Sequence, residues 1–175
     1  MSELQLPRLI SNHMVLQRDK EIHIWGRDLP GHRVMVSFRG EEAVVQTDEK
    51  GNFSLFLQKQ EAGGPFSMLF RDDLGNEEVV GDVYIGEVWF CSGQSNMELP
   101  MNRVKDRFPE DVADCKNTQI RTFKIRENGV FTAPLAELES GEWKSVQPET
   151  ILDFSAAGYY FAKALQELLK VPVGF

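Results

Sequence analysis

Short runs of apolar residues recur along the first 85 residues. Several of these runs alternate apolar and polar positions, as residues 33–38 and 53–57 do. A period of two is typical of strands that bury one face. Turn-forming stretches such as 29–31 and 63–65 separate the runs. Many short strands at close spacing predict a β-sandwich domain over residues 1–85. The other predicted strands are 14–16, 22–25, 43–45, 66–70 and 78–85.

The pattern changes at Gly86. Residues 88–91 form a continuous apolar run, which predicts a strand covered on both faces. A polar turn follows it directly. Pro109 and the acidic residues after it suit the start of a short helix. Residues 119–125 are predicted to form a further strand.

Residues 155–170 are predicted to form a helix. Ser155 is suited to cap its N-terminus, and Pro172 ends it. The predicted buried stripe consists of Phe161, Leu165 and Leu168, with Ala157 and Ala164 beside it.

Residues 171–175 resemble the beginning of another buried strand. Strand, loop, helix and strand in this order predict a parallel α/β sheet over residues 86–175. So few elements would leave apolar edges and faces of such a sheet uncovered. We therefore expect an incomplete domain here and further polypeptide beyond Phe175.

Composition narrows the possible partners. The chain has 175 residues and a net charge of −8, from 19 basic and 27 acidic residues. Nucleic acids and anionic membrane surfaces are therefore not expected partners. No stretch approaches the roughly 20 apolar residues of a membrane helix, and no signal peptide is visible. These features predict a cytoplasmic location unless a secretion signal has been removed. The two cysteines, Cys91 and Cys115, match neither a disulfide framework nor a zinc pattern.

The candidate chemistry lies at Ser95, in the run Gly93-Gln94-Ser95. The run follows the predicted strand 88–91, and α/β proteins bind ligands at the carboxyl ends of such strands. The tripeptide alone is weak evidence. The strained elbow of α/β-hydrolases requires a second glycine where this chain has Met97, so another serine-hydrolase architecture is needed.

Residues 86–98, Gly-Glu-Val-Trp-Phe-Cys-Ser-Gly-Gln-Ser-Asn-Met-Glu, resemble the characteristic block of the sialate O-acetylesterase family. Weaker matches follow the family's order along nearly the whole chain. They lie at 14–17, 25–26, 64–65, 120–123, 154–159 and 171–174.

The resemblance implies a mixed fold. A β-sandwich would lead into a three-layer α/β hydrolase domain of the SGNH type, which this chain begins without completing. It also implies that Ser95 is the nucleophile and that its backbone N–H is one oxyanion donor. The remaining oxyanion donors, a Gly and an Asn, and an Asp/His pair would lie beyond Phe175. The isolated chain is therefore expected to be inactive.

The function implied is that of a serine esterase. It would remove O-acetyl groups from carbohydrate, O-acetylated sialic acid in particular, through an acetyl-serine intermediate and without a metal or other cofactor. Its partners would be the acetylated sugar and the remaining C-terminal polypeptide. A non-catalytic sugar-binding or interaction module is the alternative.

Other residues near Ser95 have two interpretations each. Gln94 and Asn96 could donate hydrogen bonds into the site or satisfy the backbone of their own loop. Glu98 could orient a sugar hydroxyl, although a solvated loop carboxylate is the simpler interpretation. The three histidines, His13, His23 and His32, lie in the β-rich segment, where surface or strand positions are expected. One of them could still reach the site, because triad partners need not be close in sequence.

Overall fold

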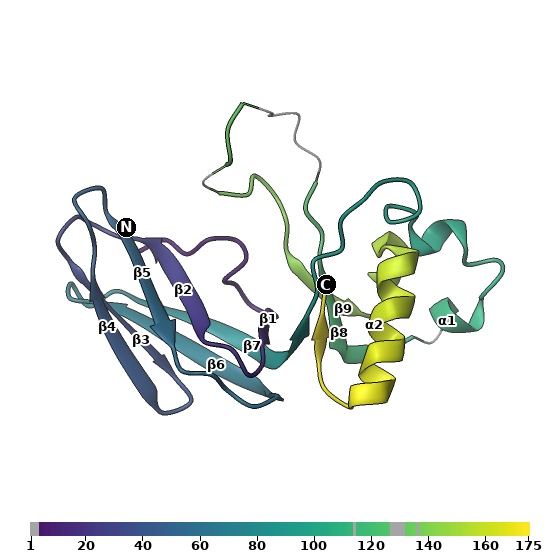
Figure 1. The fold of residues 1–175 in the computed structure, drawn as a ribbon, viewed down its shortest axis with the longest axis horizontal. Helices are drawn as coiled ribbons and strands as arrows, with labels where there is room; N and C mark the ends of the chain where they lie inside the picture. Colours follow the sequence, from purple (N-terminus) through teal and green to yellow (C-terminus); the bar gives the residue numbers. More distant parts are fainter. Residues whose placement is uncertain (1–3, 114, 127–131, 136) are drawn as a thin grey trace.

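The computed structural model describes residues 4–113, 115–126, 132–135 and 137–175, which form a mixed, strand-rich fold (Figure 1). The strands are β1 (Val15–Gln17), β2 (Ile22–Arg27), β3 (Arg33–Phe38), β4 (Glu41–Gln46), β5 (Asn52–Leu57), β6 (Gly63–Asp72), β7 (Glu77–Val88), β8 (Asn117–Phe123), β9 (Trp143–Val146) and β10 (Val173–Gly174). The helices are α1 (Glu110–Ala113) and α2 (Ala156–Leu169), with short 3₁₀ turns at Met101–Arg103 and Ile151–Asp153.

Among the described residues, eight strands form one open sheet. Its order is β4-β3-β6-β7-β10-β8-β9, and β1 pairs with β7 outside this path. The β1, β7, β10 and β8 pairings are parallel, whereas β4-β3-β6-β7 and β8-β9 are antiparallel. Strands β2 and β5 form a separate antiparallel pair. Figure 1 shows this pair in front of the antiparallel strands, while α2 lies against β8 and β10.

Two hydrophobic clusters stabilise the fold. The first joins the β2–β5 pair to the antiparallel strands and includes Ile24, Val36 and Phe70, all fully buried. Strand β5 alternates exposed and buried positions, and in β3 every second residue is buried while Met35 and Ser37 between them are half-buried. Both strands confirm the predicted period of two. The second cluster packs α2 and the 3₁₀ turns against β8 and β10, around Ile120 and Val173.

Strand β7 runs from the first hydrophobic cluster to the strands of the second. Val83 and Ile85 are buried in the first cluster, whereas Glu87 and Val88 pair with β10. The domain boundary expected between residues 85 and 86 falls inside this strand. Continuous backbone pairing therefore connects the two clusters.

The strand predicted over 88–91 is wrong in its extent and burial. Strand β7 ends at Val88, and the last ladder contact is from Trp89 N to Gly174 O at 2.9 Å. Trp89 is 46% exposed and Phe90 is 84% exposed. The physical reason is that β10 stops at Gly174, so the chain beyond Trp89 has no described strand to pair with.

The predicted helix is confirmed, but its predicted buried face is wrong. Ser155 caps α2 by accepting a hydrogen bond from Gly158 N at 3.1 Å. Phe161 and Leu168 are exposed, and Leu165 is half-buried. Small side chains decide the orientation, because they allow the helix to approach the sheet closely. The buried residues of α2 are Ala156, Gly158, Tyr159 and Ala162.

Arg121 on β8 connects the two clusters through polar contacts. Its side chain is 1% exposed and lies over the Tyr84 ring, 4.3 Å from the ring centroid. The guanidinium donates to the carbonyl of His13 at 2.7 Å and to Asp82 Oδ2 at 2.9 Å. Asp82 also contacts His13 Nδ1 at 2.7 Å. Burial raises the pKa of Asp82, but hydrogen bonds from His13 and Arg121 outweigh it and hold the pKa below its ordinary value.

We expect Asp82→Asn to destabilise the fold by about 2 kcal/mol at neutral pH, because it leaves the buried Arg121 cation without its counter-ion. Asn tolerates the left-handed backbone at this position, where φ is 54°. Because the folded pKa of Asp82 is lowered, its contribution is present at neutral pH and is lost as pH falls through that pKa. The deficit of the variant should therefore shrink below about pH 4. Urea unfolding across pH measures both effects.

The control for this prediction is Glu77→Gln, which removes an exposed partner of Arg71. Exposed ion pairs contribute little, so we expect a change of at most about 1 kcal/mol. Equal losses in the two variants would contradict the role assigned to Arg121 and Asp82.

Candidate active site

Three segments meet at one edge of the parallel sheet. Strands β7, β10 and β8 run in the same direction and end at Val88, Gly174 and Phe123. Backbone hydrogen bonds join the strands at this edge. One of them is donated by Phe123 N, at the end of β8, to Phe175 O, just after β10, at 2.9 Å. The 89–99 loop follows β7, and Lys124 follows β8. This edge is where parallel α/β sheets bind ligands.

Ser95 lies in a tight turn within the 89–99 loop. Glu98 N and Leu99 N both donate to the Ser95 carbonyl, at 3.1 and 2.9 Å. The loop is anchored to the start of α2, because Ala156 N donates to Leu99 O at 2.8 Å. The hydroxyl of Ser155 also lies 3.8 Å from Met97 Sδ. The sequence around Ser95 is thus positioned by one strand and one helix N-terminus.

The backbone of Ser95 is in the left-handed region, with φ at 51°. This conformation costs a residue with a Cβ roughly 1–2 kcal/mol and is often found at functional sites. Its side chain is exposed, and its hydroxyl makes a long contact of 3.4 Å with Gln94 Oε1. The Ser95 hydroxyl is therefore accessible to a ligand.

A pocket of about 340 Å³ lies beside this turn. Its lining includes Ser92, Gly93, Met97 and Glu98 of the loop and Phe175 at the edge of the sheet. Gln94, Ser95 and Asn96 are exposed on the turn and are not among the residues that line it. The structure thus brings Glu98 into the pocket and leaves the other three predicted site residues on the turn beside it.

The histidines lie in the β-rich part of the molecule. His13 contacts Asp82 at 2.7 Å, His32 contacts Asp73 at 2.6 Å, and His23 contacts Ser54 at 2.8 Å. None of the three lines the pocket beside Ser95. The residues that the structure describes therefore place no imidazole beside Ser95.

The described residues give little support for a reactive cysteine or a metal site at this edge. Burial raises the pKa of the Cys91 thiol, so this pocket residue is a neutral thiol at pH 7. In the described parts of the chain, no group of three or more His, Cys, Asp and Glu side chains could hold a metal ion. The described helices are also too short or too polar to cross a membrane.

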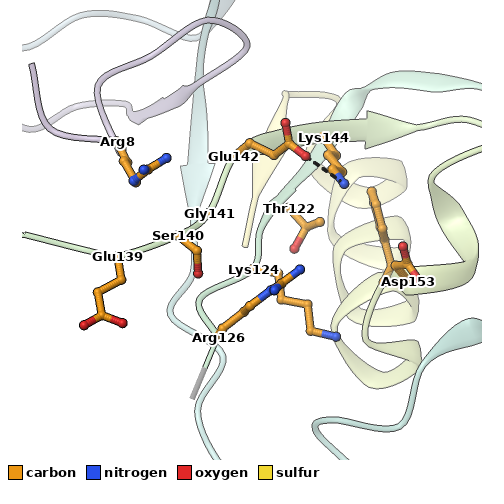
Figure 2. A pocket seen from close by; sticks show the side chains of 11 residues that line it. Arg8, Thr122, Lys124, Arg126, Glu139, Ser140, Gly141, Glu142, Lys144 and Asp153 are labelled. Atoms are coloured by element: carbon orange, nitrogen blue, oxygen red, sulfur yellow. Dashed lines mark ion pairs between the residues drawn. The ribbon is translucent and has the colours of Figure 1, made fainter. Parts of the chain in front are cut away.

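A second pocket, of about 680 Å³, adjoins the first and shares Thr122, Lys124 and Arg126 with it (Figure 2). Sequence reasoning missed this pocket. The signal was present in Lys124 and Arg126, two basic residues at the end of the predicted strand 119–125 in an acidic chain. The charged residues that line it are Arg8, Lys124, Arg126, Lys144, Glu139, Glu142 and Asp153.

Comparison with known proteins links this arrangement to acetylesterases. A human sialate O-acetylesterase is 35% identical over 94% of this chain, and a mouse sialate O-acetylesterase is 27% identical over the same share. The crystal structure of a carbohydrate acetylesterase from Xanthomonas citri superposes with a TM-score of 0.92 and 37% identity over 98% of this chain. The resemblance to the sialate O-acetylesterase family is confirmed. No family model matches the chain.

The matched part of each sialate O-acetylesterase is limited. The chain spans about a third of the length of these curated relatives, 34% for the mouse protein and 35% for the human one. It covers 39% of the Xanthomonas carbohydrate acetylesterase chain. The names of these relatives denote carboxylic ester hydrolases, and the strand-rich fold with its open sheet is close to that of the carbohydrate acetylesterase.

Proposed function

We propose that this chain carries the nucleophile of an esterase that removes O-acetyl groups from carbohydrate. The observation that carries the proposal is the position of Ser95, exposed in a left-handed turn at the carboxyl edge of the parallel strands. The similarity to acetylesterases along 94% or more of the chain supports the same chemistry. The names of the curated relatives favour O-acetylated sialic acid as the substrate.

The proposed reaction is acyl transfer through Ser95. Its Oγ attacks the acetyl carbonyl carbon, and a histidine outside this chain takes the hydroxyl proton. The Ser95 N–H and further donors hold the oxyanion. Collapse of the intermediate breaks the bond to the sugar oxygen, which leaves with the proton from the histidine. Water then attacks the acetyl-serine and releases acetate.

The proposed architecture is a β-sandwich over residues 1–85 followed by the first part of an SGNH-type α/β domain over 86–175. The β2–β5 pair packed on the antiparallel strands supports the first part, and the parallel β7-β10-β8 strands with α2 support the second. Exposed Phe90, Phe161 and Leu168 support a further layer of polypeptide on this half.

A sugar-binding module without catalysis is the second candidate function. An exposed aromatic stack on the β2–β5 pair favours it. His23 stacks between Trp25 and Phe56, with ring centroids 4.9 and 4.6 Å apart, and Phe56 is 60% exposed. Aromatic side chains with open faces are common in binding surfaces.

Acetate release separates the two candidates. We expect the complete protein, meaning this chain with any polypeptide encoded beyond Phe175, to hydrolyse both an aryl acetate and O-acetylated sialic acid. We expect residues 1–175 alone to show little turnover, because the described chain offers Ser95 no base. Binding of sugar without hydrolysis by the complete protein would favour the module. Strong turnover by residues 1–175 would show that their own histidines suffice.

A further inference from the structure

The last residue of β7 points its backbone N–H toward a strand that has already ended. Glu87 N and Trp89 N each donate at 2.9 Å to carbonyl groups in or next to β10. Successive N–H groups of a strand point to opposite sides, so the Val88 N–H between them faces β1. Strand β1 ends at Gln17, which is paired with Gly86. Val88 N therefore lies beyond the last backbone partner that β1 offers.

The side chain of Gln17 takes the place of that backbone partner. Its Oε1 accepts a hydrogen bond from Val88 N at 2.8 Å. This contact determines the orientation of the amide, because a backbone N–H can only donate and must face the oxygen. The amide Nε2 donates to Arg18 O at 3.2 Å and makes a long contact of 3.5 Å with Glu87 Oε2. The side chain thus extends the pairing of β1 with β7 by one hydrogen bond.

Arg18 and Glu87 hold the two strands together around this amide. Arg18 Nε donates to Glu87 Oε1 at 2.7 Å, and the two side chains are only 29% and 17% exposed. Arg18 N also donates to Gly86 O at 2.8 Å. Hydrogen bonds that are partly shielded from water are stronger than those on an open surface. Gln17, Arg18 and Glu87 therefore form one hydrogen-bonded cluster at the end of β7.

This cluster lies at the start of the loop that carries Ser95. Trp89, the residue after Val88, begins the 89–99 loop, and Ala156 N anchors the other end through Leu99 O. The position of Ser95 therefore depends on how firmly the end of β7 is held. Without an acceptor for Val88 N, the start of the loop can move away from the sheet. A displacement of about 1 Å at a catalytic group can reduce the rate about a hundredfold.

We propose that Gln17 is a positioning residue, which fixes the start of the 89–99 loop and thereby the place of Ser95. The inference rests on the proposed esterase function and adds to it a residue from the β-rich part of the chain. Gln17 lines neither the pocket beside Ser95 nor the larger pocket next to it. It acts through the backbone of β7 and does not touch the substrate.

Gln17→Met in the complete protein removes the acceptor while keeping an unbranched side chain of similar length. We expect kcat for an aryl acetate to fall about tenfold or more with KM within about twofold, because the nucleophile is misplaced and the pocket is kept. The value of kcat is taken per active site titrated with a fluorophosphonate, so that unfolded protein does not contribute. A loss of titratable sites with the parent's kcat per site would overturn the proposal, since Gln17 would then only stabilise the fold.

A second variant and a matched control sharpen this test. Gln17→Asn keeps the amide but shortens the side chain by one methylene, so its oxygen no longer reaches Val88 N, and kcat per site should fall as in Gln17→Met. Gln46→Met is the control, because Gln46 also ends a strand, β4, and donates to a backbone carbonyl, Gly31 O at 2.9 Å. It should keep the parent's kcat within about twofold. The parent's kcat in Gln17→Asn, or an equal loss in Gln46→Met, would overturn the proposal.

Amide hydrogen exchange tests the same contact without requiring catalysis. In Gln17→Met, protection of the Val88 amide should fall about tenfold or more, because local opening at the end of β7 becomes easier. The Tyr84 amide on the same strand, which donates to Met14 O at 3.0 Å, should keep its protection. Unchanged protection of Val88 would overturn the proposal. A parent without esterase activity would refute the proposed function, whereas an active parent with the same kcat per site in Gln17→Met would refute the role of Gln17 alone.

Discussion

Replacing Ser95 with alanine should remove nearly all esterase activity from the complete protein. The variant deletes the only atom that can form the proposed acetyl-enzyme, so we expect kcat to fall by about a thousandfold or more. Ser95 is exposed and its hydroxyl makes one long contact, so the fold should be retained. Initial rates with an aryl acetate measure the effect, and circular dichroism checks the fold.

Ser67→Ala is the matched control, because Ser67 is also an exposed serine and lies on β6, outside both pockets. It should keep the parent's rate within about twofold. If Ser95→Ala kept the activity of the Ser67 control, Ser95 would not be the nucleophile. Another residue of the complete protein would then have to form the acyl-enzyme.

The second large effect is expected at Gly86, where β7 passes from one cluster to the other. A Cβ at this position would overlap the carbonyl of Pro172, lying 2.6 Å from its carbon and 3.0 Å from its Cα. Glu87 N donates to the same carbonyl at 2.9 Å. Since backbone cannot rotate away as a side chain can, Gly86→Ala must push β10 away from β7. We expect a loss of about 3 kcal/mol or more in the free energy of unfolding.

Gly81→Ala on the same strand provides the control. The nearest atom to a Cβ there is Asn12 Oδ1 at 3.7 Å, an ordinary contact. This variant should stay within about 1 kcal/mol of the parent. Chemical denaturation of the two variants gives the comparison. Equal stability in both would show that close packing of β10 on β7 does not stabilise the fold.

The elements were predictable from local patterns, but their partners were not. The period of two identified β3 and β5, and the cap at Ser155 identified α2, because these signals depend on neighbouring residues. Which face of α2 is buried depends on what packs against it. Gly158 lies so close to Phe175 that a Cβ would be 2.6 Å from the ring, and this contact turns Phe161 outward.

In the candidate site, too, some features could be predicted from the sequence and others could not. Ser95 was singled out because residues 86–98 resemble the characteristic block of the sialate O-acetylesterase family, whereas its motif after a strand was weak evidence alone. The structure places Ser95 in the turn after β7. The pairing of Arg121 with Asp82 and the convergence of Arg8 with Arg126 join residues far apart in the chain. The order of strand, loop, helix and strand predicted a parallel sheet here, but it did not specify which strands are neighbours or which side chains they bring together.

Mass mapping of the reactive serine tests most directly whether Ser95 is the nucleophile. The complete protein is treated with a fluorophosphonate, which traps an activated serine as a stable adduct, and is then digested and sequenced by mass spectrometry. We expect one adduct, a phosphonyl group on Ser95, and none in the Ser95→Ala variant. An adduct on any other serine, with Ser95 unmodified in an active preparation, would contradict it.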